Sequence, residues 1–424
     1  MRYKLRAMKP TLFLALLAAL LPQQPAVRAF VGATVIEGSG PVLERATIVV
    51  RSGRIVEIGP RAEVPKGAAV VDVAGRTIVP GLINAHGHVG ETTGLRSGPE
   101  TYSRENALSQ LRRYARYGVT SVLSLGGDQP PSFELRDAQG VETLDRARLY
   151  VAGPVLTPST PEEAADAVAR AAALHPDFLK IRVDDNLGTT SKMPEPTYRA
   201  VIDHAHRRKL RLAAHLFYLA DAKALLRAGA DFIAHSVRDA DVDEELIKLL
   251  KERDVCVCPT LAREVSTFVY ETRPAFFDDP FFLRDADKQV LEQLQDLKRQ
   301  QAMRESKAAQ RYKVALEVAS RNLKTLADRG VRIAFGTDTG PPARFQGYFE
   351  HLELELMAKA GLTPQQILRS ATGDAARCIG LQGQIGSLQR GAWADFVVLK
   401  ENPLTDIRKM RTIDAVYIAG NRVN

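Results

Sequence analysis

Cysteine is scarce in this chain of 424 residues, which contains only Cys256, Cys258 and Cys378. Three cysteines cannot form the disulfide framework that stabilises small secreted domains, so that class of protein is excluded. Cys256 and Cys258 lie two residues apart in an expected strand, where their side chains share one face. We interpret them as small buried apolar side chains, with a pair of soft-metal ligands as the alternative.

The sequence also lacks clustered basic residues, although its formal charge is +8. Residues 1–29 hold five of the 58 basic side chains and none of the 50 acidic ones, which leaves 53 basic against 50 acidic groups elsewhere. A nucleic-acid surface needs Lys and Arg gathered on one face, so we expect no nucleic-acid partner. Apolar residues make up 45% and charged residues 25%, which excludes a disordered or fibrous chain.

No apolar run is long enough for a membrane-spanning helix. The run at residues 11–21 falls short of the roughly 20 residues that a span requires. Basic residues precede it and the small-residue site Val27-Arg28-Ala29 follows it, which is typical of a secretory signal peptide. We therefore predict a signal peptide at residues 1–29, cleavage near Ala29, and an exported protein, periplasmic or secreted, whose mature chain is not stably inserted in a membrane. An uncleaved membrane anchor is the alternative.

The two ends of the chain share one pattern. Residues 30–80 and 384–424 consist of short β-rich runs separated by Gly and Pro turns, and neither shows a long helical period. This pattern predicts a small composite β-sandwich domain built from both termini.

Residues 81–383 instead alternate short apolar runs with segments of helical period, such as 106–118 and 221–230, each closed by a glycine. Eight strands with intervening helices predict an α/β fold, a (β/α)8 TIM barrel. An open doubly wound sheet is the alternative, but it normally carries a Gly-rich phosphate turn after its first strand, and this sequence has none. The expected strands are 82–89, 119–126, 148–156, 178–184, 211–217, 232–237, 255–261 and 332–338.

An insertion at residues 262–328 separates the last two expected strands. It begins with an aromatic-rich stretch at 268–282 and continues as a charged helix over 285–329. In a barrel such an insertion emerges on the catalytic face, so it is a possible lid or a wall of an apolar pocket. The alternative is a packing or oligomer contact, which leaves a homo-oligomer open.

Histidines and one aspartate mark the expected strand ends. His86 and His88 lie two apart on a strand, so both imidazoles point the same way and can hold one cation. His215, His235 and Asp338 end other strands, where a barrel presents its catalytic groups. Imidazole and carboxylate ligands favour Zn, Fe, Mn or Co over Ca or Mg.

Lys180 lies in the middle of an apolar strand. An unpaired ammonium there would be costly to bury, so the pKa of the amine should fall and leave it neutral and nucleophilic. A neutral amine can take up CO2 as a carbamate, an anionic ligand with two oxygens that could bridge two metals. The alternative is a lysine whose ammonium reaches solvent at the barrel mouth.

These motifs resemble those of the amidohydrolase superfamily, in particular its imidazolonepropionase-like and prolidase-like metal-dependent hydrolases. The matching segments are VPGLINAHGHV, the strand that carries Lys180, AAH at His215, AHS at His235 and GTD at Asp338, together with the C-terminal GSLQRGAWADFVVL. The resemblance implies a barrel with a composite β-sandwich and two divalent metal ions, with Zn²⁺ as the first choice. It implies that His86, His88 and Asp338 hold one ion, that His215 and His235 hold the other, and that a CO2-derived carbamate on Lys180 bridges them.

The sequence departs from the family pattern in two places. Asn84 stands where many members have Asp, which bears on the support of the metal ligands. Residues 151–164 lack the Gly-Gly-His stretch of many dipeptidase-like relatives, which puts peptide specificity in doubt.

From these ligands we expect a hydrolase that cleaves a C–N bond in an amide, N-acyl amino acid, dipeptide or cyclic amide by attack of a metal-bridging hydroxide. Asp338 is expected to accept the proton of the water and pass it to the leaving amine. A lactonase or phosphotriesterase-like hydrolase with the same site is one alternative, and a catalytically silent binding barrel is another.

Four residues that follow metal-bearing strands are predicted to contact a small-molecule substrate. The alternative for each is an ordinary residue at the barrel rim, because loops vary freely. They are Tyr218, Arg238, Thr260 and Arg344.

Overall fold

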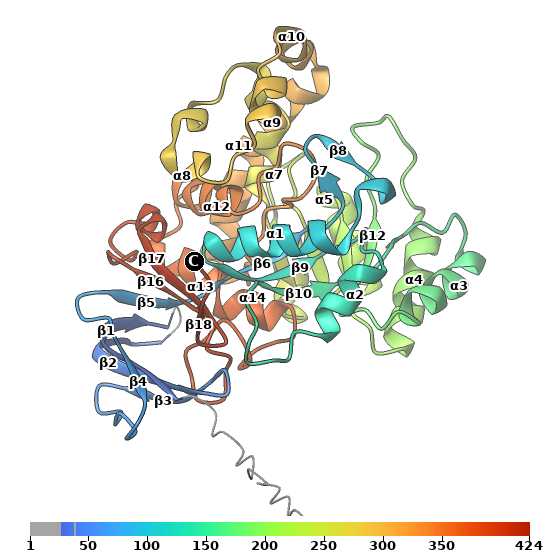
Figure 1. Cartoon of the computed structure of the whole chain (residues 1–424). Coiled ribbons are helices and arrows are strands. Elements are labelled where there is room, and N and C mark those ends of the chain that lie inside the picture. Colours follow the sequence, from blue (N-terminus) through green and yellow to red (C-terminus); the bar gives the residue numbers. More distant parts are fainter. Residues whose placement is uncertain (1–26, 38–39) are drawn as a thin grey trace, which may run out of the picture.

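The computed structural model describes residues 27–37 and 40–424, so the expected signal peptide lies outside the described residues up to position 26. The described chain has a mixed α/β fold, as predicted, in which one sheet adjoins two sets of parallel strands and their helices (Figure 1). In this part of the chain no helix combines the length and the apolar character that a membrane span needs.

Strands from both ends of the chain share one eight-stranded sheet, in the order β18-β17-β16-β5-β1-β2-β3, with β4 paired to β1. Figure 1 shows the blue β1–β5 beside the red β16–β18. The rings of Phe30, Phe396 and Tyr417 pack together in the core of this sheet. Arg28 and Ala29 already pair with the next strand, so the expected cleavage site falls inside β1. The strands are β1 (Arg28–Ile36), β2 (Val42–Arg51), β3 (Arg54–Gly59), β4 (Ala69–Asp72), β5 (Thr77–Pro80), β16 (Phe396–Leu399), β17 (Ile413–Ile418) and β18 (Asn421–Arg422).

The middle of the chain forms two parallel sheets, one in the order β10-β9-β6 and one in the order β11-β12-β13-β14-β15. Their strands are almost entirely buried, as expected where helices cover parallel strands. The strands are β6 (Leu82–Gly87), β9 (Val119–Ser124), β10 (Arg148–Val151), β11 (Val155–Leu156), β12 (Leu179–Arg182), β13 (Leu212–His215), β14 (Phe232–Ala234) and β15 (Cys256–Cys258).

Helices follow most of these strands, and their ends agree with the sequence signals. The helix expected at 106–118 is α1, whose N-cap Ser103 accepts a hydrogen bond from the Asn106 amide. The helix expected at 221–230 is α5, which Gly229 closes at a φ of 112°. The helices are α1 (Arg104–Arg116), α2 (Pro130–Asp137), α3 (Pro161–Ala172), α4 (Glu195–Arg207), α5 (Leu219–Ala228), α6 (Glu244–Glu252), α13 (Pro364–Ser370) and α14 (Gly373–Cys378).

Two expected strands differ in the structure. Residues 148–156 are divided into β10 and β11, because Gly153 adopts a φ of 72° and Pro154 has no amide hydrogen to donate. Residues 332–338 form no regular strand, so that prediction is wrong. This segment makes only isolated parallel bridges, from Ile333 to Val257 and from Thr339 to Gly87. Strand pairing among the described residues therefore leaves two parallel sheets and not one closed ring.

The insertion is built from several helices, of which α11 is long and the others are short. The prediction of one helix over 285–329 is wrong, because Asp287, Asp296 and Ser306 each accept a backbone amide and start a new helix. The aromatic stretch packs on itself and on α12, with Phe282 and Tyr348 among the ring pairs. Figure 1 shows α9 and α10 standing away from the parallel strands. The elements are α7 (Leu261–Ser266), α8 (Pro280–Leu283), α9 (Lys288–Leu294), α10 (Leu297–Glu305), α11 (Lys307–Asp328) and α12 (Tyr348–Lys359).

A disulfide joins Cys256 in β15 to Cys378 at the end of α14 across 122 residues of sequence. The interpretation of Cys256 as a plain apolar side chain is therefore wrong, whereas Cys258 is a free, buried thiol. The partner of Cys256 could not be inferred from sequence, because α14 reaches β15 only through the packing of the intervening chain.

The disulfide should raise the stability of the protein. We expect Cys378→Ala to lower the free energy of unfolding by about 2–5 kcal/mol, because the unfolded chain loses a long cross-linked loop. Denaturant unfolding measures the loss, and reducing agent should then affect wild type but not the variant. Peptide mapping under non-reducing conditions should recover Cys256 linked to Cys378. Recovery of three alkylated thiols would contradict the assignment.

Candidate metal centre

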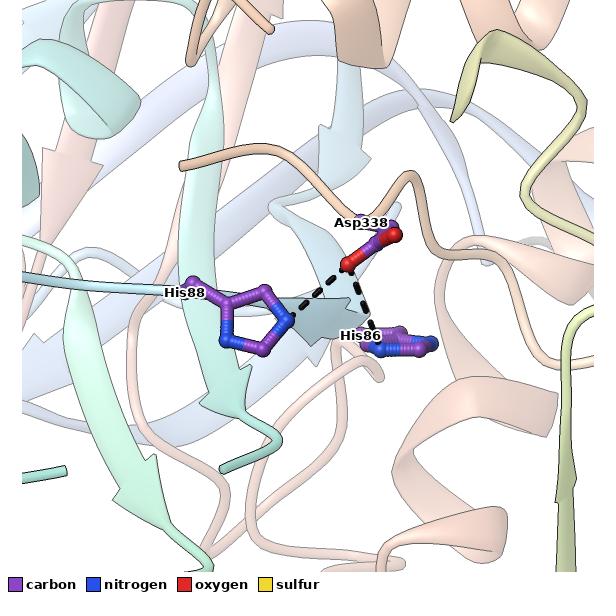
Figure 2. A group of neighbouring side chains, drawn as sticks. All are labelled: His86, His88 and Asp338. Carbon is purple, nitrogen blue, oxygen red and sulfur yellow. Dashed lines mark hydrogen bonds and ion pairs between the residues drawn. The ribbon is translucent and has the colours of Figure 1, made fainter. Parts of the chain in front are cut away.

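His86, His88 and Asp338 form a compact group at the carboxyl end of β6. The Oδ1 atom of Asp338 lies 2.9 Å from Nε2 of His88 and 3.5 Å from Nε2 of His86 (Figure 2). Each residue offers one ligand atom within 4.8 Å of the others, and His86 and Asp338 are buried. Nδ1 of His86 is buried without a hydrogen-bond partner. A buried donor set of two imidazoles and a carboxylate fits a divalent transition metal.

Backbone bonds between β6 and the segment that carries Asp338 bring this group together. The amide of Asp338 donates to the carbonyl of His86 at 2.6 Å, and the amide of His88 donates to the carbonyl of Thr339 at 2.7 Å. Gly336 permits the approach, because a Cβ there would lie 2.8 Å from the backbone nitrogen of His86. His86 and His88 thus form one cluster with Asp338, which lies about 250 residues later in the chain.

Electrostatics within the group favour an ionised aspartate. Burial opposes the charge of Asp338, but Arg344 and the two imidazoles outweigh it and hold the pKa of its carboxyl well below the usual range. Burial also opposes a charged His88, yet the hydrogen bond to Asp338 raises the pKa of His88 to about 9. Burial keeps the pKa of His86 well below its ordinary value, so this ring is neutral. Nδ1 of His88 lies 2.9 Å from the carbonyl oxygen of Gly126, which directs Nε2 toward Asp338.

The other three predicted ligands surround this group. Nζ of Lys180 lies 3.4 Å from Nε2 of His86, and burial lowers the pKa of the amine to about 8. The His235 ring lies 4.7 Å from that of His86 and 4.3 Å from that of His215, measured between centroids. All six predicted ligands are therefore neighbours, and His86, His88 and Asp338 offer atoms close enough to hold one ion together.

His215 and His235 are oriented by protein partners. Nε2 of His215 lies 2.7 Å from Oδ2 of Asp184, and burial lowers the pKa of His215 to about 3. Nδ1 of His235 lies 2.7 Å from the Thr260 hydroxyl, which leaves its Nε2 free. Asp184 ends the strand segment of Lys180, but nothing in the sequence identified it as the partner of His215.

The predicted substrate residues divide into two pairs. Thr260 and Arg344 contact predicted ligands, since Nη1 of Arg344 lies 2.5 Å from Oδ2 of Asp338. Tyr218 donates instead to Asp185 at 2.9 Å, and Arg238 is wholly buried against Glu264. No contact brings Tyr218 or Arg238 to the compact ligand group among the described residues.

A cavity of about 510 Å³ opens at the carboxyl end of β12. Arg182, Asp184, Lys192 and Met193 contribute to its lining. Asp184, the partner of His215, is among the lining residues, whereas none of the six predicted ligands lines this cavity.

A buried network around Asn84 supports the compact group. The Asn84 side-chain oxygen accepts the amides of His86 at 3.0 Å and Thr337 at 3.3 Å. Its amide nitrogen donates to Glu350 of α12 at 2.8 Å, and the hydroxyls of Thr337 and Thr339 donate to the same carboxylate oxygen at 2.7 and 2.6 Å. The asparagine that departs from the family pattern thus serves as both acceptor and donor next to a buried glutamate.

Known proteins are similar to this chain along most of its length. A sequence model described as the amidohydrolase family matches residues 77–423. The chain is 26% identical to ochratoxinase of Aspergillus niger over 90% of this chain and 82% of that protein, and 26% identical to imidazolonepropionase of Pseudomonas entomophila over 86% and 90%. A crystal structure of a Xaa-Pro dipeptidase with bound methionine superposes with a TM-score of 0.76 at 20% identity, over 94% of this chain and 99% of that one, and shows the fold alone.

The Glu350 carboxylate should be needed for both stability and metal retention. We expect Glu350→Ala to lower the free energy of unfolding by about 1–3 kcal/mol, because buried donors on Asn84, Thr337 and Thr339 lose their acceptor. Metal content per chain should fall with it. Glu350→Gln keeps one carbonyl oxygen that can accept hydrogen bonds, so the free energy of unfolding and the metal content should fall less than in Glu350→Ala. Wild-type stability and metal content in Glu350→Ala would contradict the role of the network.

Proposed function

This chain belongs to the amidohydrolase family, and from that premise we propose that it hydrolyses the C–N bond of an amide, N-acyl amino acid, dipeptide or cyclic amide. The prediction of a metal-dependent amidohydrolase is confirmed at the level of the family. The buried convergence of His86, His88 and Asp338 is the observation that carries the proposal to this site.

We assign His86, His88 and Asp338 to one ion, His215 and His235 to a second, and a carbamate on Lys180 to the bridge. The neutral imidazoles of His86 and His215 and the lowered pKa of Lys180 support this assignment, since a carbamate forms from a neutral amine. When bound, two divalent cations, Zn²⁺ or alternatively Mn, Fe or Co, lower the pKa of a water molecule and polarise the scissile carbonyl.

The residues of the chain perform the proton transfers and the positioning. Asp338 accepts a proton from the attacking water and returns it to the leaving nitrogen. The contacts of His88 with Gly126 and of His235 with Thr260 hold these rings in place.

The closed (β/α)8 barrel and export of the protein are further parts of the proposal. The bridges of residues 333 and 339 to β15 and β6 support closure, because one segment bonds to both parallel sheets. The disulfide supports an oxidising compartment, since cytosolic thiols are kept reduced.

A panel of amides, dipeptides, lactones and phosphotriesters tests the reaction class with metal-loaded protein. Hydrolysis of the amides supports the proposal. Turnover of lactones or phosphotriesters without amides would favour the first alternative. Failure to bind metal and to turn over any substrate would favour a silent binding barrel.

Asp338→Asn should retain metal and lose turnover. The amide can still serve as a ligand but cannot accept a proton, so kcat should fall by about 100-fold to 10,000-fold. Metal analysis and steady-state rates on the same sample separate the two effects, with Asp278→Asn on the exposed insertion as the control. Rates near wild type in Asp338→Asn would refute its role.

Lys180→Ala should lose at least one metal ion per chain, because no carbamate can form. A small added carboxylate such as acetate should restore metal and part of the activity by replacing the missing oxygens. The exposed Lys248→Ala is the control. Two ions per chain in Lys180→Ala without added carboxylate would rule out the bridge.

A further inference from the structure

The Asp338 carboxylate has a second side that faces arginines. Its Oδ1 atom lies near the two imidazoles, whereas its Oδ2 atom lies 2.5 Å from Nη1 of Arg344 and 4.0 Å from Nε of Arg263. Arg263 comes from α7, directly after β15, and Arg344 comes from the loop that follows Asp338. Two guanidinium groups thus border the side of Asp338 that is turned away from His86 and His88.

The charges behind these arginines do not balance. Glu264 is shared between Nη1 of Arg263 at 3.0 Å and Nε of Arg238 at 3.1 Å, and both Glu264 and Arg238 are fully buried. Asp184 is within electrostatic reach of Arg238 but bonds to His215. Because Asp338 pairs with Arg344, two carboxylates, Glu264 and Asp338, stand against three guanidinium groups, which leaves one positive charge in excess.

The outer two arginines are open to a ligand. The side chains of Arg263 and Arg344 keep 10% and 17% exposure, whereas that of Arg238 keeps none. Nε of Arg263 is buried without a hydrogen-bond partner, as are Nε and Nη2 of Arg238. Excess positive charge with unused donors is costly to bury, and an anion bound to these side chains would offset that cost.

We propose that Arg263 and Arg344 bind a carboxylate of the substrate, one attached to the leaving-group side of the scissile C–N bond. Guanidinium groups match the planar, two-oxygen geometry of a carboxylate. Asp338 passes its proton to the leaving nitrogen, so a group bound beside Oδ2 of Asp338 belongs to that half of the substrate. Glu264 contacts both Arg238 and Arg263 and so holds Arg263 in place.

This inference rests on the proposed function and narrows its substrate class. It selects N-acyl amino acids and dipeptides with a free carboxylate next to the nitrogen. Neutral amides, lactones and phosphotriesters lack the group that the arginines would bind.

Paired substrates test the proposal on the metal-loaded protein. N-acetyl derivatives of the twenty amino acids are compared as free acids and as carboxamides, which share the same scissile bond. We expect about 10–100-fold higher kcat/KM for the free acid of the preferred pair, since bonds to a charged group contribute that much. Arg263→Gln should remove most of this preference by lowering the free-acid value alone, and Arg263→Lys should retain part of it.

Arg344→Gln gives a second, independent variant, and the exposed Arg273→Gln is the matched control. Equal rates for acid and carboxamide in wild type, or an equal fall for both in Arg263→Gln, would overturn the carboxylate site while leaving the amidohydrolase activity in place. If no substrate turns over, the proposed function fails, and equilibrium dialysis of the free acids with metal-free protein decides the carboxylate site. Retention by wild type but not by Arg263→Gln would support it, and equal retention would overturn it.

Discussion

The tie between β6 and the segment at 337–339 is the constraint on which the rest of the site depends. Asn84 and Glu350 hold these two pieces of backbone together through buried hydrogen bonds, and the amides of His88 and Asp338 complete the contact. Because every donor in this network is buried, losing one acceptor leaves polar groups without water to replace it. His86 and His88, from the start of the α/β region, thereby lie next to Asp338, from its end.

The Asp338 carboxylate joins two different electrostatic environments. On one side it faces imidazoles that suit a divalent cation, and on the other side it faces Arg344 and Arg263. Both environments hold the carboxyl in its charged form. The same side chain can therefore serve as a metal ligand while lying next to the positive charge that would select a substrate.

The insertion contributes to the site through α7 at its beginning. Thr260 and Arg263 lie on or beside this short helix, and its first amides donate to the buried Glu353 of α12 at 2.9 and 2.6 Å. Most of the aromatic residues that follow pack with one another and with Tyr348 and Phe349, whereas Phe268 packs against Phe217 and Tyr312. The apolar character of the stretch at 268–282 thus reflects packing against α12.

Local sequence determined the mixed α/β class and the helices α1 and α5, because strand alternation, helical period and capping depend on neighbours within a few residues. It also predicted as metal ligands six residues that the fold brings close together. It also singled out Asn84 as a departure from the family pattern. Only the tertiary structure decided that Cys256 pairs with Cys378, that Asp184 holds His215, and that Glu350 and Arg263 stand next to the ligand group. These partners are far apart in the chain, and no local period records a contact that arises only when whole elements pack. The strand expected at residues 332–338 failed for the same reason, since Ile333 and Thr339 make isolated bridges to the distant β15 and β6, and Asp338 has a left-handed φ of 57°.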